Sequence, residues 1–137
     1  MNELILNSET RQDKIVFSNA LNNHNTLFGG IAMKWMDEVA YITAIRFSKK
    51  KMVTVSADKI QFLAPIKVGS IVEILGKVIK VGVIKITIQV DINIQDINTG
   101  KRTKATSAMF TFAAVDESNK PILVEEKLHT EMVFQDR

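Results

Sequence analysis

The alternating segment at residues 83–96, VIKITIQVDINIQD, constrains the fold of this chain more than any other feature. Every second residue is apolar, and polar or charged residues stand between them; the apolar ones are Ile84, Ile86, Ile88, Val90, Ile92 and Ile94. Because successive side chains of a β-strand point to opposite faces, this pattern predicts a strand with one buried and one polar face.

Further segments have the same period of two and are bounded by glycine, proline or a turn. They are predicted as long strands at 51–65, 70–82 and 101–116, and Asn98 to Gly100 is predicted as a hairpin turn. After a polar lead-in, residues 14–21 are predicted as a short first strand. The segment 121–137 could hold a short helix.

One long helix is predicted from Ile31 to Phe47, entered through Gly29 and Gly30. Four of its residues form one narrow polar stripe, and most of the rest of its circumference is apolar; the stripe consists of Lys34, Asp37, Glu38 and Tyr41. A helix with this distribution is normally covered on several sides. We therefore expect a single α+β domain over residues 1–137, with a curved antiparallel sheet wrapped around one long central helix. Its core is expected at about 14–116, with a C-terminal tail at 121–137.

The composition excludes several kinds of site. The chain has 137 residues and no cysteine, which rules out disulfides, thiolate metal ligands and cysteine nucleophiles. Its two histidines are far apart, so no metal site is expected. The net charge of +3 would suit an anionic ligand or none. No signal peptide or membrane span is visible, so we expect a cytoplasmic protein with no membrane partner. With 7% aromatic residues, nucleic-acid binding is not expected.

Three stretches resemble the hotdog-fold acyl-coenzyme A (CoA) thioesterases. They are LNNHNTLFGGIAMKWMDEVAYITA, VTVSADKIQFLAPIKVGS and KATSAMFTFAAVDESNKP, and together they span about residues 19–121. The resemblance is to the group of bacterial short-chain acyl-CoA hydrolases and the brain-type acyl-CoA hydrolase. One departure is Asn25, where the family usually has glycine. Asparagine tolerates the left-handed conformation better than most residues, so we expect the loop to be kept.

The resemblance implies a catalytic pair. The helix aspartate of the family matches Asp37, which would act as general base on a water or attack the carbonyl directly. The loop asparagine matches Asn22, although Asn23 is close enough to confuse the register. The N–H groups near Gly29 and Gly30 could stabilise an oxyanion. In the family these residues come from two subunits, which implies a homodimer with a continuous sheet and, by resemblance, a trimer of dimers.

The expected contacts to CoA are more widely spread. Arg102 and Lys104 point to one face of the last strand, and Thr106 follows them; by resemblance this region meets the nucleotide. The other expected contacts are Gly29, Thr26 and Ser56. The alternative for the two cations is an ordinary charged sheet edge. No cofactor is expected besides the CoA of the substrate.

Several alternatives stay open. Asp37 could be a solvated helix position, Glu38 could pair with Lys34, and Asp58 could be a solvated strand residue. His24 could serve a hydroxyacyl dehydratase or hydratase, which generally uses a histidine with an acid. A non-catalytic acyl-CoA sensor is a third class.

Overall fold

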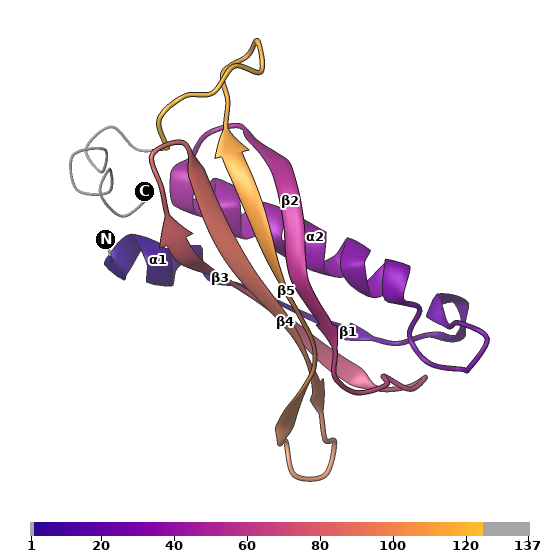
Figure 1. The fold of residues 1–137 in the computed structure, drawn as a ribbon. Coiled ribbons are helices and arrows are strands. Elements are labelled where there is room, and N and C mark those ends of the chain that lie inside the picture. Colours follow the sequence, from indigo (N-terminus) through magenta and orange to yellow (C-terminus); the bar gives the residue numbers. More distant parts are fainter. Residues whose placement is uncertain (1, 125–137) are drawn as a thin grey trace.

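The computed structural model describes residues 2–124, which form one sheet wrapped around one long helix (Figure 1). The five strands have the order β1-β3-β4-β5-β2, and all neighbours are antiparallel. The elements in chain order are α1 (Asn2–Ser8), β1 (Thr10–Ile15), the 3₁₀ helix η1 (Ser18–Ala20), α2 (Gly29–Ser48), β2 (Met52–Phe62), β3 (Ile71–Val81), β4 (Lys85–Gln95) and β5 (Arg102–Ala114). The predicted α+β hotdog architecture is confirmed.

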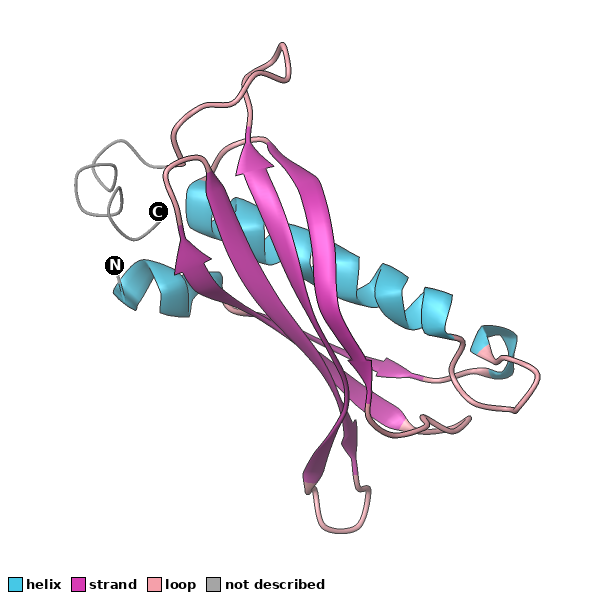
Figure 2. Cartoon of the chain, viewed as in Figure 1, coloured by secondary structure: helices cyan, strands magenta, loops and turns pink. Residues whose placement is uncertain are grey.

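The core lies between the concave face of the sheet and α2 (Figure 2). The predicted alternation of β4 is confirmed, because its central apolar residues are buried; these are Ile86, Ile88, Val90 and Ile92. Phe110 and Phe112 of β5 lie beside them in the sheet and are also buried. Apart from Met36 and Phe47, the buried side chains of the helix are small or medium-sized, so it can lie close to the strands.

Gly76 of β3 marks the closest approach of α2 to the sheet. A methyl group added at Gly76 would lie 2.6 Å from the Thr43 hydroxyl oxygen and 2.9 Å from a Val39 methyl carbon. Those distances are shorter than van der Waals contact, so the position requires glycine. The Thr43 hydroxyl donates to the Val39 carbonyl oxygen at 2.9 Å, which keeps its polar group satisfied inside the core.

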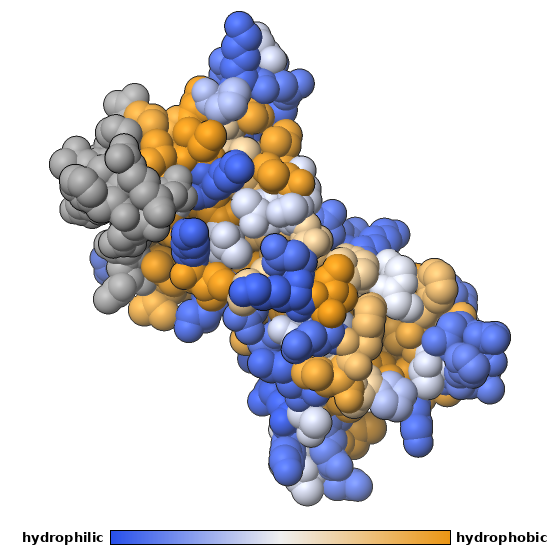
Figure 3. All heavy atoms as spheres, viewed as in Figure 1, coloured by the Kyte–Doolittle hydropathy of each residue, from blue (hydrophilic) through white to orange (hydrophobic). Residues whose placement is uncertain are grey.

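The two edge strands of the sheet differ in character. β1 consists of TRQDKI and is largely polar. Every residue of β2 after Met52 is exposed, and several are apolar; the exposed apolar ones are Val53, Val55, Ile60 and Phe62. In the space-filling view, apolar side chains reach the surface along the course of β2 (Figure 3). An open apolar edge is a template for pairing with another strand.

The first strand was predicted at the wrong place. It covers Thr10–Ile15 rather than 14–21, and η1 follows it. The reason is the antiparallel pairing of β1 with β3, which uses polar residues whose outer face meets solvent. The lead-in forms α1, whose Leu4 and Ile5 pack against the core.

The remaining element boundaries agree more closely with those predicted from the sequence. The helix begins two residues earlier than predicted, so Gly29 and Gly30 are its first residues. The turn at Asn98 to Gly100 is confirmed. The predicted helix in the tail falls mostly on residues outside the described range. Between residues 2 and 124, no helix is both long and apolar enough to cross a lipid bilayer.

Candidate active site

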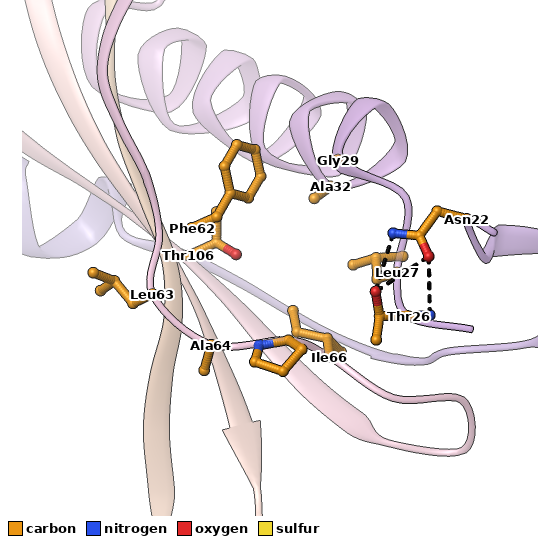
Figure 4. A pocket seen from close by; sticks show the side chains of 11 residues that line it. Asn22, Thr26, Leu27, Gly29, Ala32, Phe62, Leu63, Ala64, Ile66 and Thr106 are labelled. Carbon is orange, nitrogen blue, oxygen red and sulfur yellow. Dashed lines mark hydrogen bonds between the residues drawn. The ribbon is translucent and has the colours of Figure 1, made fainter. Parts of the chain in front are cut away.

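A cleft of about 390 Å³ opens between the start of α2 and the segment that follows β2. Figure 4 shows the helix start on one side, the Asn22 loop on another, and Phe62 opposite that loop. The lining residues are Asn22, Thr26, Leu27, Gly29, Ala32, Phe62, Leu63, Ala64, Pro65, Ile66 and Thr106. The cleft thus combines a mostly apolar wall with a few polar groups at its loop end.

The Asn22 side chain organises this loop. Its carbonyl oxygen accepts hydrogen bonds from the backbone N–H groups of His24 at 2.8 Å and Thr26 at 3.2 Å. Its amide nitrogen donates to the Thr26 hydroxyl oxygen at 3.0 Å. The amide carries two N–H bonds, and hydrogen bonds within residues 2–124 use one of them. Asn25 has φ +63°, so the expected left-handed conformation is confirmed.

The start of α2 offers two unused backbone donors. The N–H groups of Ile31 and Ala32 both donate to the Phe28 carbonyl oxygen at 3.0 Å, and no side chain of residues 2–124 caps the helix. No hydrogen bond within the described residues uses the N–H of Gly29 or Gly30. Gly29 also lines the cleft. A helix N-terminus carries partial positive charge, so these donors suit an oxyanion.

Asp37 lies two turns farther along α2, on the exposed polar stripe. Partial burial of its carboxyl group raises its pKa above the ordinary value, and the neighbouring charge of Glu38 raises it further. Thr54 of β2 faces the carboxyl group and lowers the same pKa by hydrogen bonding. A carboxylate with a raised pKa next to a hydroxyl group is a candidate base or nucleophile.

Within one subunit, the structure does not bring Asp37 to the Asn22 cleft. Asp37 does not line the cleft. Asp37 is seven positions after Gly30 in α2, which is on the order of 10 Å along the axis. The chain therefore carries two separate groups of candidate residues, one at the Asn22 loop and one at Asp37 and Thr54.

The expected CoA contacts are divided between two sheet faces. Arg102 Nε lies 3.2 Å from a carboxylate oxygen of Glu73, and Lys104 Nζ lies 3.6 Å from one of Asp91. Glu73 also accepts from Arg11 Nε at 2.9 Å. These ion pairs lie on the outer face of the sheet, away from α2. Both cations are therefore engaged with carboxylates in the single subunit.

Thr106 does not share the face of Arg102 and Lys104, contrary to the alternation assumed from the sequence. A β-bulge inserts Ala105 between the pairs Lys104 with Asn93 and Thr106 with Ile92. The bulge reverses the alternation, so Thr106 is buried and lines the cleft. Ser56 pairs with Thr111 and does not line the cleft.

Two residues of the site were missed from the sequence. Thr54 lies in an alternating strand and was read only as part of it, and Phe62 was read as strand. What marks both residues is their position in the folded structure, since each faces α2 from the edge strand. Asn23 and His24 are exposed and lie outside the cleft. In the described part of the chain, no group of three or more acidic or histidine residues could hold a metal ion.

Comparison with known proteins identifies the family. The model of the thioesterase superfamily matches residues 24–101. The acyl-CoA thioester hydrolase YkhA of Bacillus subtilis is 38% identical over 80% of this chain, and this chain spans 63% of its length, which is less than two thirds. A cytosolic acyl coenzyme A thioester hydrolase of Rattus norvegicus is 35% identical over 75% of this chain and 28% of its own length.

Solved structures agree with these matches. An acyl-CoA hydrolase of Staphylococcus aureus, solved with butyryl coenzyme A and coenzyme A, superposes with a TM-score of 0.84; it is 34% identical over 87% of this chain and 73% of its own. The same hydrolase was also solved as single Asn-to-Ala, Asp-to-Ala and Thr-to-Ala mutants. The mutated Asp is 15 positions after the mutated Asn, and the mutated Thr is 17 positions after that Asp.

A second solved structure adds an assembly. The hexameric thioesterase of Yersinia pestis has a TM-score of 0.75 and 32% identity over 82% of this chain and 91% of its own. Sequence and fold agree over most of the chain in each comparison. This chain therefore belongs to the hotdog-fold acyl-CoA thioester hydrolases of the thioesterase superfamily.

Proposed function

We propose that this protein hydrolyses acyl-CoA thioesters to a free fatty acid and CoA, with Asp37 as the reacting carboxylate. The observation that carries the proposal is the pair of unused N–H groups at Gly29 and Gly30, which open beside the Asn22 cleft. Two donors at a helix start can stabilise the negative charge that develops on a thioester carbonyl oxygen.

The chemistry follows from these roles. As general base, Asp37 takes a proton from water while the water oxygen attacks the thioester carbon. As nucleophile, it forms an acyl-enzyme anhydride that water then cleaves. In both routes the carbon–sulfur bond breaks and the CoA thiolate leaves. The remaining N–H of Asn22 would orient the water or the thioester carbonyl, which is a positioning role.

The spacing of residues supports these assignments. Asn22 and Asp37 are 15 positions apart, and Asp37 and Thr54 are 17 apart. The residues mutated in the Staphylococcus aureus hydrolase are of the same three types in the same order and have the same separations. On this basis Thr54 joins the site, where its hydroxyl would hold the Asp37 carboxylate in place and lower its pKa.

The separation of the two groups along α2 supports a composite site. We propose a homodimer in which the Asn22 loop of one subunit meets Asp37 of the other, with the sheet continued across the open edge of β2. Relatives of this fold are hexameric, which supports assembly of the dimers into a trimer of dimers. We also propose a cytoplasmic location; the rat relative is named cytosolic.

We also propose that Arg102 and Lys104 bind the CoA phosphates. The ion pairs of the structure set a condition for this binding. Each cation must leave its carboxylate partner, or share it, to reach a phosphate. We expect Arg102→Ala and Lys104→Ala to raise KM several-fold with little change in kcat, because remote contacts act on ground and transition states alike. Steady-state kinetics at two salt concentrations would check this, since salt should reproduce the effect in the wild type.

The test of the reaction is thiol release from acyl-CoA by the wild type, Asp37→Asn and Glu38→Gln. We expect Asp37→Asn to lose about 10²–10⁴-fold in kcat, the usual contribution of acid–base catalysis. Glu38→Gln removes the neighbouring carboxylate from the same helix turn and serves as the matched control, with nearly full turnover. Full activity in Asp37→Asn would refute the catalytic assignment.

A further inference from the structure

The cleft beside the helix start has an apolar wall that the catalytic roles do not explain. Leu27, Ala32 and Ile66 form buried parts of this wall. Ala32 is on the first turn of α2, three residues after Gly29, and both are small. The cleft is therefore roomy at the point where the helix begins, and Leu27, Ala32 and Ile66 give it apolar side chains.

The position of the cleft relates it to the thioester. If the carbonyl oxygen accepts from the N–H groups of Gly29 and Gly30, the carbonyl carbon lies at the mouth of the cleft. The Phe62 ring reaches the same point, since a methyl group added at Gly29 would lie 3.4 Å from its Cζ. Figure 4 shows this ring turned toward the helix start. Whatever extends from the carbonyl carbon into the cleft must pass beside Phe62.

Two parts of an acyl-CoA extend from that carbon: the acyl chain and the pantetheine arm. The arm carries amide groups, whose burial is costly without hydrogen-bond partners. Asn22 and Thr26, the polar residues at the loop end, are bonded to each other and leave one Asn22 N–H unused, and Thr106 is the other polar side chain of the described lining. A hydrocarbon chain needs no such partners, so the wall suits the acyl chain better.

The size of the cleft points to a limit on length. Its volume of about 390 Å³ lies near the lower end of small-molecule sites, which span about 300–1,000 Å³. It can hold an acyl chain but not a whole acyl-CoA. Phe62 is the largest side chain in the lining, it is 60% exposed, and it comes from the edge strand. Its ring can therefore change the free length of the cleft more than any other single lining residue.

We propose that this cleft binds the acyl chain of the thioester and that Phe62 determines which chain lengths fit. This inference rests on the proposed function. Substrate discrimination then arises because each methylene buried in the cleft contributes about 0.8 kcal/mol, or roughly fourfold in kcat/KM, until the Phe62 ring stops the chain.

The experiment is a chain-length profile of kcat/KM over straight-chain acyl-CoAs for the wild type, Phe62→Ala and Ile60→Ala. Ile60 is the matched control, because it is also an exposed apolar residue of β2 but does not line the cleft. In Phe62→Ala we expect the longest accepted chains to gain at least tenfold relative to the shortest. Ile60→Ala should keep the wild-type profile.

Further variants keep the outcome interpretable. If Phe62→Ala fails to fold or assemble, Phe62→Leu provides a smaller opening with apolar surface retained. Ala32→Leu should act in the opposite direction and shorten the accepted range. Equal changes for all chain lengths, together with altered inhibition by free CoA, would place the pantetheine arm in the cleft and overturn the proposal. An unchanged profile would overturn it as well. No hydrolysis of any acyl-CoA by the wild type would instead refute the proposed function.

Discussion

The two groups of candidate residues in this chain are built in different ways. The Asn22 group is complete within one subunit: its loop is closed by side-chain hydrogen bonds, its helix donors are in place, and its cleft has walls. The Asp37 group is open, because Asp37 lies on an exposed stripe and its partner Thr54 lies on β2, which has no second neighbouring strand within residues 2–124. The difference supports the proposal that another subunit completes the second group.

The physical reason lies in what each group needs. Substrate binding and oxyanion stabilisation need a fixed backbone, which a short loop and a helix start can provide locally. A reactive carboxylate needs removal from water, which an exposed helix face cannot provide alone. A partner subunit across β2 would exclude water from Asp37 and bring the Asn22 loop of that subunit to it.

Among the tests of this comparison, the largest effect is expected when the open edge is blocked. Val55 of β2 and Ile15 of β1 are 48% and 49% exposed, one on each edge of the sheet. Val55→Lys should dissociate the dimer and lower activity at least about 10²-fold, because a lysine on an edge strand opposes strand pairing. Sedimentation velocity and thiol release at the same protein concentration would check this.

Ile15→Lys is the control with matched exposure on the opposite edge. It should leave the dimer and most of the activity intact. A Val55→Lys protein that remains dimeric would show that β2 is not the pairing edge. A monomer with full activity would show that both groups act within one subunit.

The next largest effect on activity is expected when inactive subunits are mixed. Asn22→Ala and Asp37→Ala homodimers should each be nearly inactive, because every site lacks one residue. Random assembly makes about half of the dimers mixed, and each mixed dimer regains one intact site out of two. Co-expressed subunits should therefore recover about a quarter of wild-type activity. Mixed dimers that show no recovery would place Asn22 and Asp37 of one chain in the same site.

The contrast between a group built locally and a group that depends on distant parts of the fold also explains which features could be predicted from the sequence. The long helix and the strands after it were predictable, since their periods of 3.6 and 2 are local properties of the chain. The left-handed Asn25 was predictable from the resemblance, because the family usually has glycine there and asparagine tolerates this conformation. The first strand was misplaced because β1 is polar and is defined by its pairing with β3.

Residues of the site were harder where tertiary structure decides. Thr106 was grouped with Arg102 and Lys104 as an expected CoA contact, and the bulge at Ala105 turns it into the cleft instead. Arg102 pairs with Glu73 of β3 and Lys104 with Asp91 across the β4–β5 hairpin, and both pairs depend on the strand register, which no local pattern fixes. Thr54 and Phe62 acquire their roles from facing α2, a property of the folded sheet.

The smallest expected effect concerns pH and tests the surroundings of Asp37 directly. Asp37 must be ionised to act as base or nucleophile, so kcat/KM should fall as the pH drops through its pKa. Burial raises that pKa, which places the acid limb above the ordinary range of an aspartate. Thr54 stabilises the charged form, so Thr54→Val should move the limb to higher pH. Glu38 destabilises the charged form of Asp37, so Glu38→Gln should move the acid limb to lower pH.

Thr54→Ser keeps a hydroxyl group and should restore the wild-type limb, which separates hydrogen bonding from packing. The measurement is the pH dependence of kcat/KM for the wild type and the three variants, because this ratio reports the groups of the free enzyme. Shifts of the acid limb in opposite directions for Thr54→Val and Glu38→Gln would identify Asp37 as the titrating group. Only a carboxylate next to both neighbours has its pKa changed by both substitutions. Identical acid limbs in all four proteins would assign the titration to another group and remove the pKa argument for Asp37.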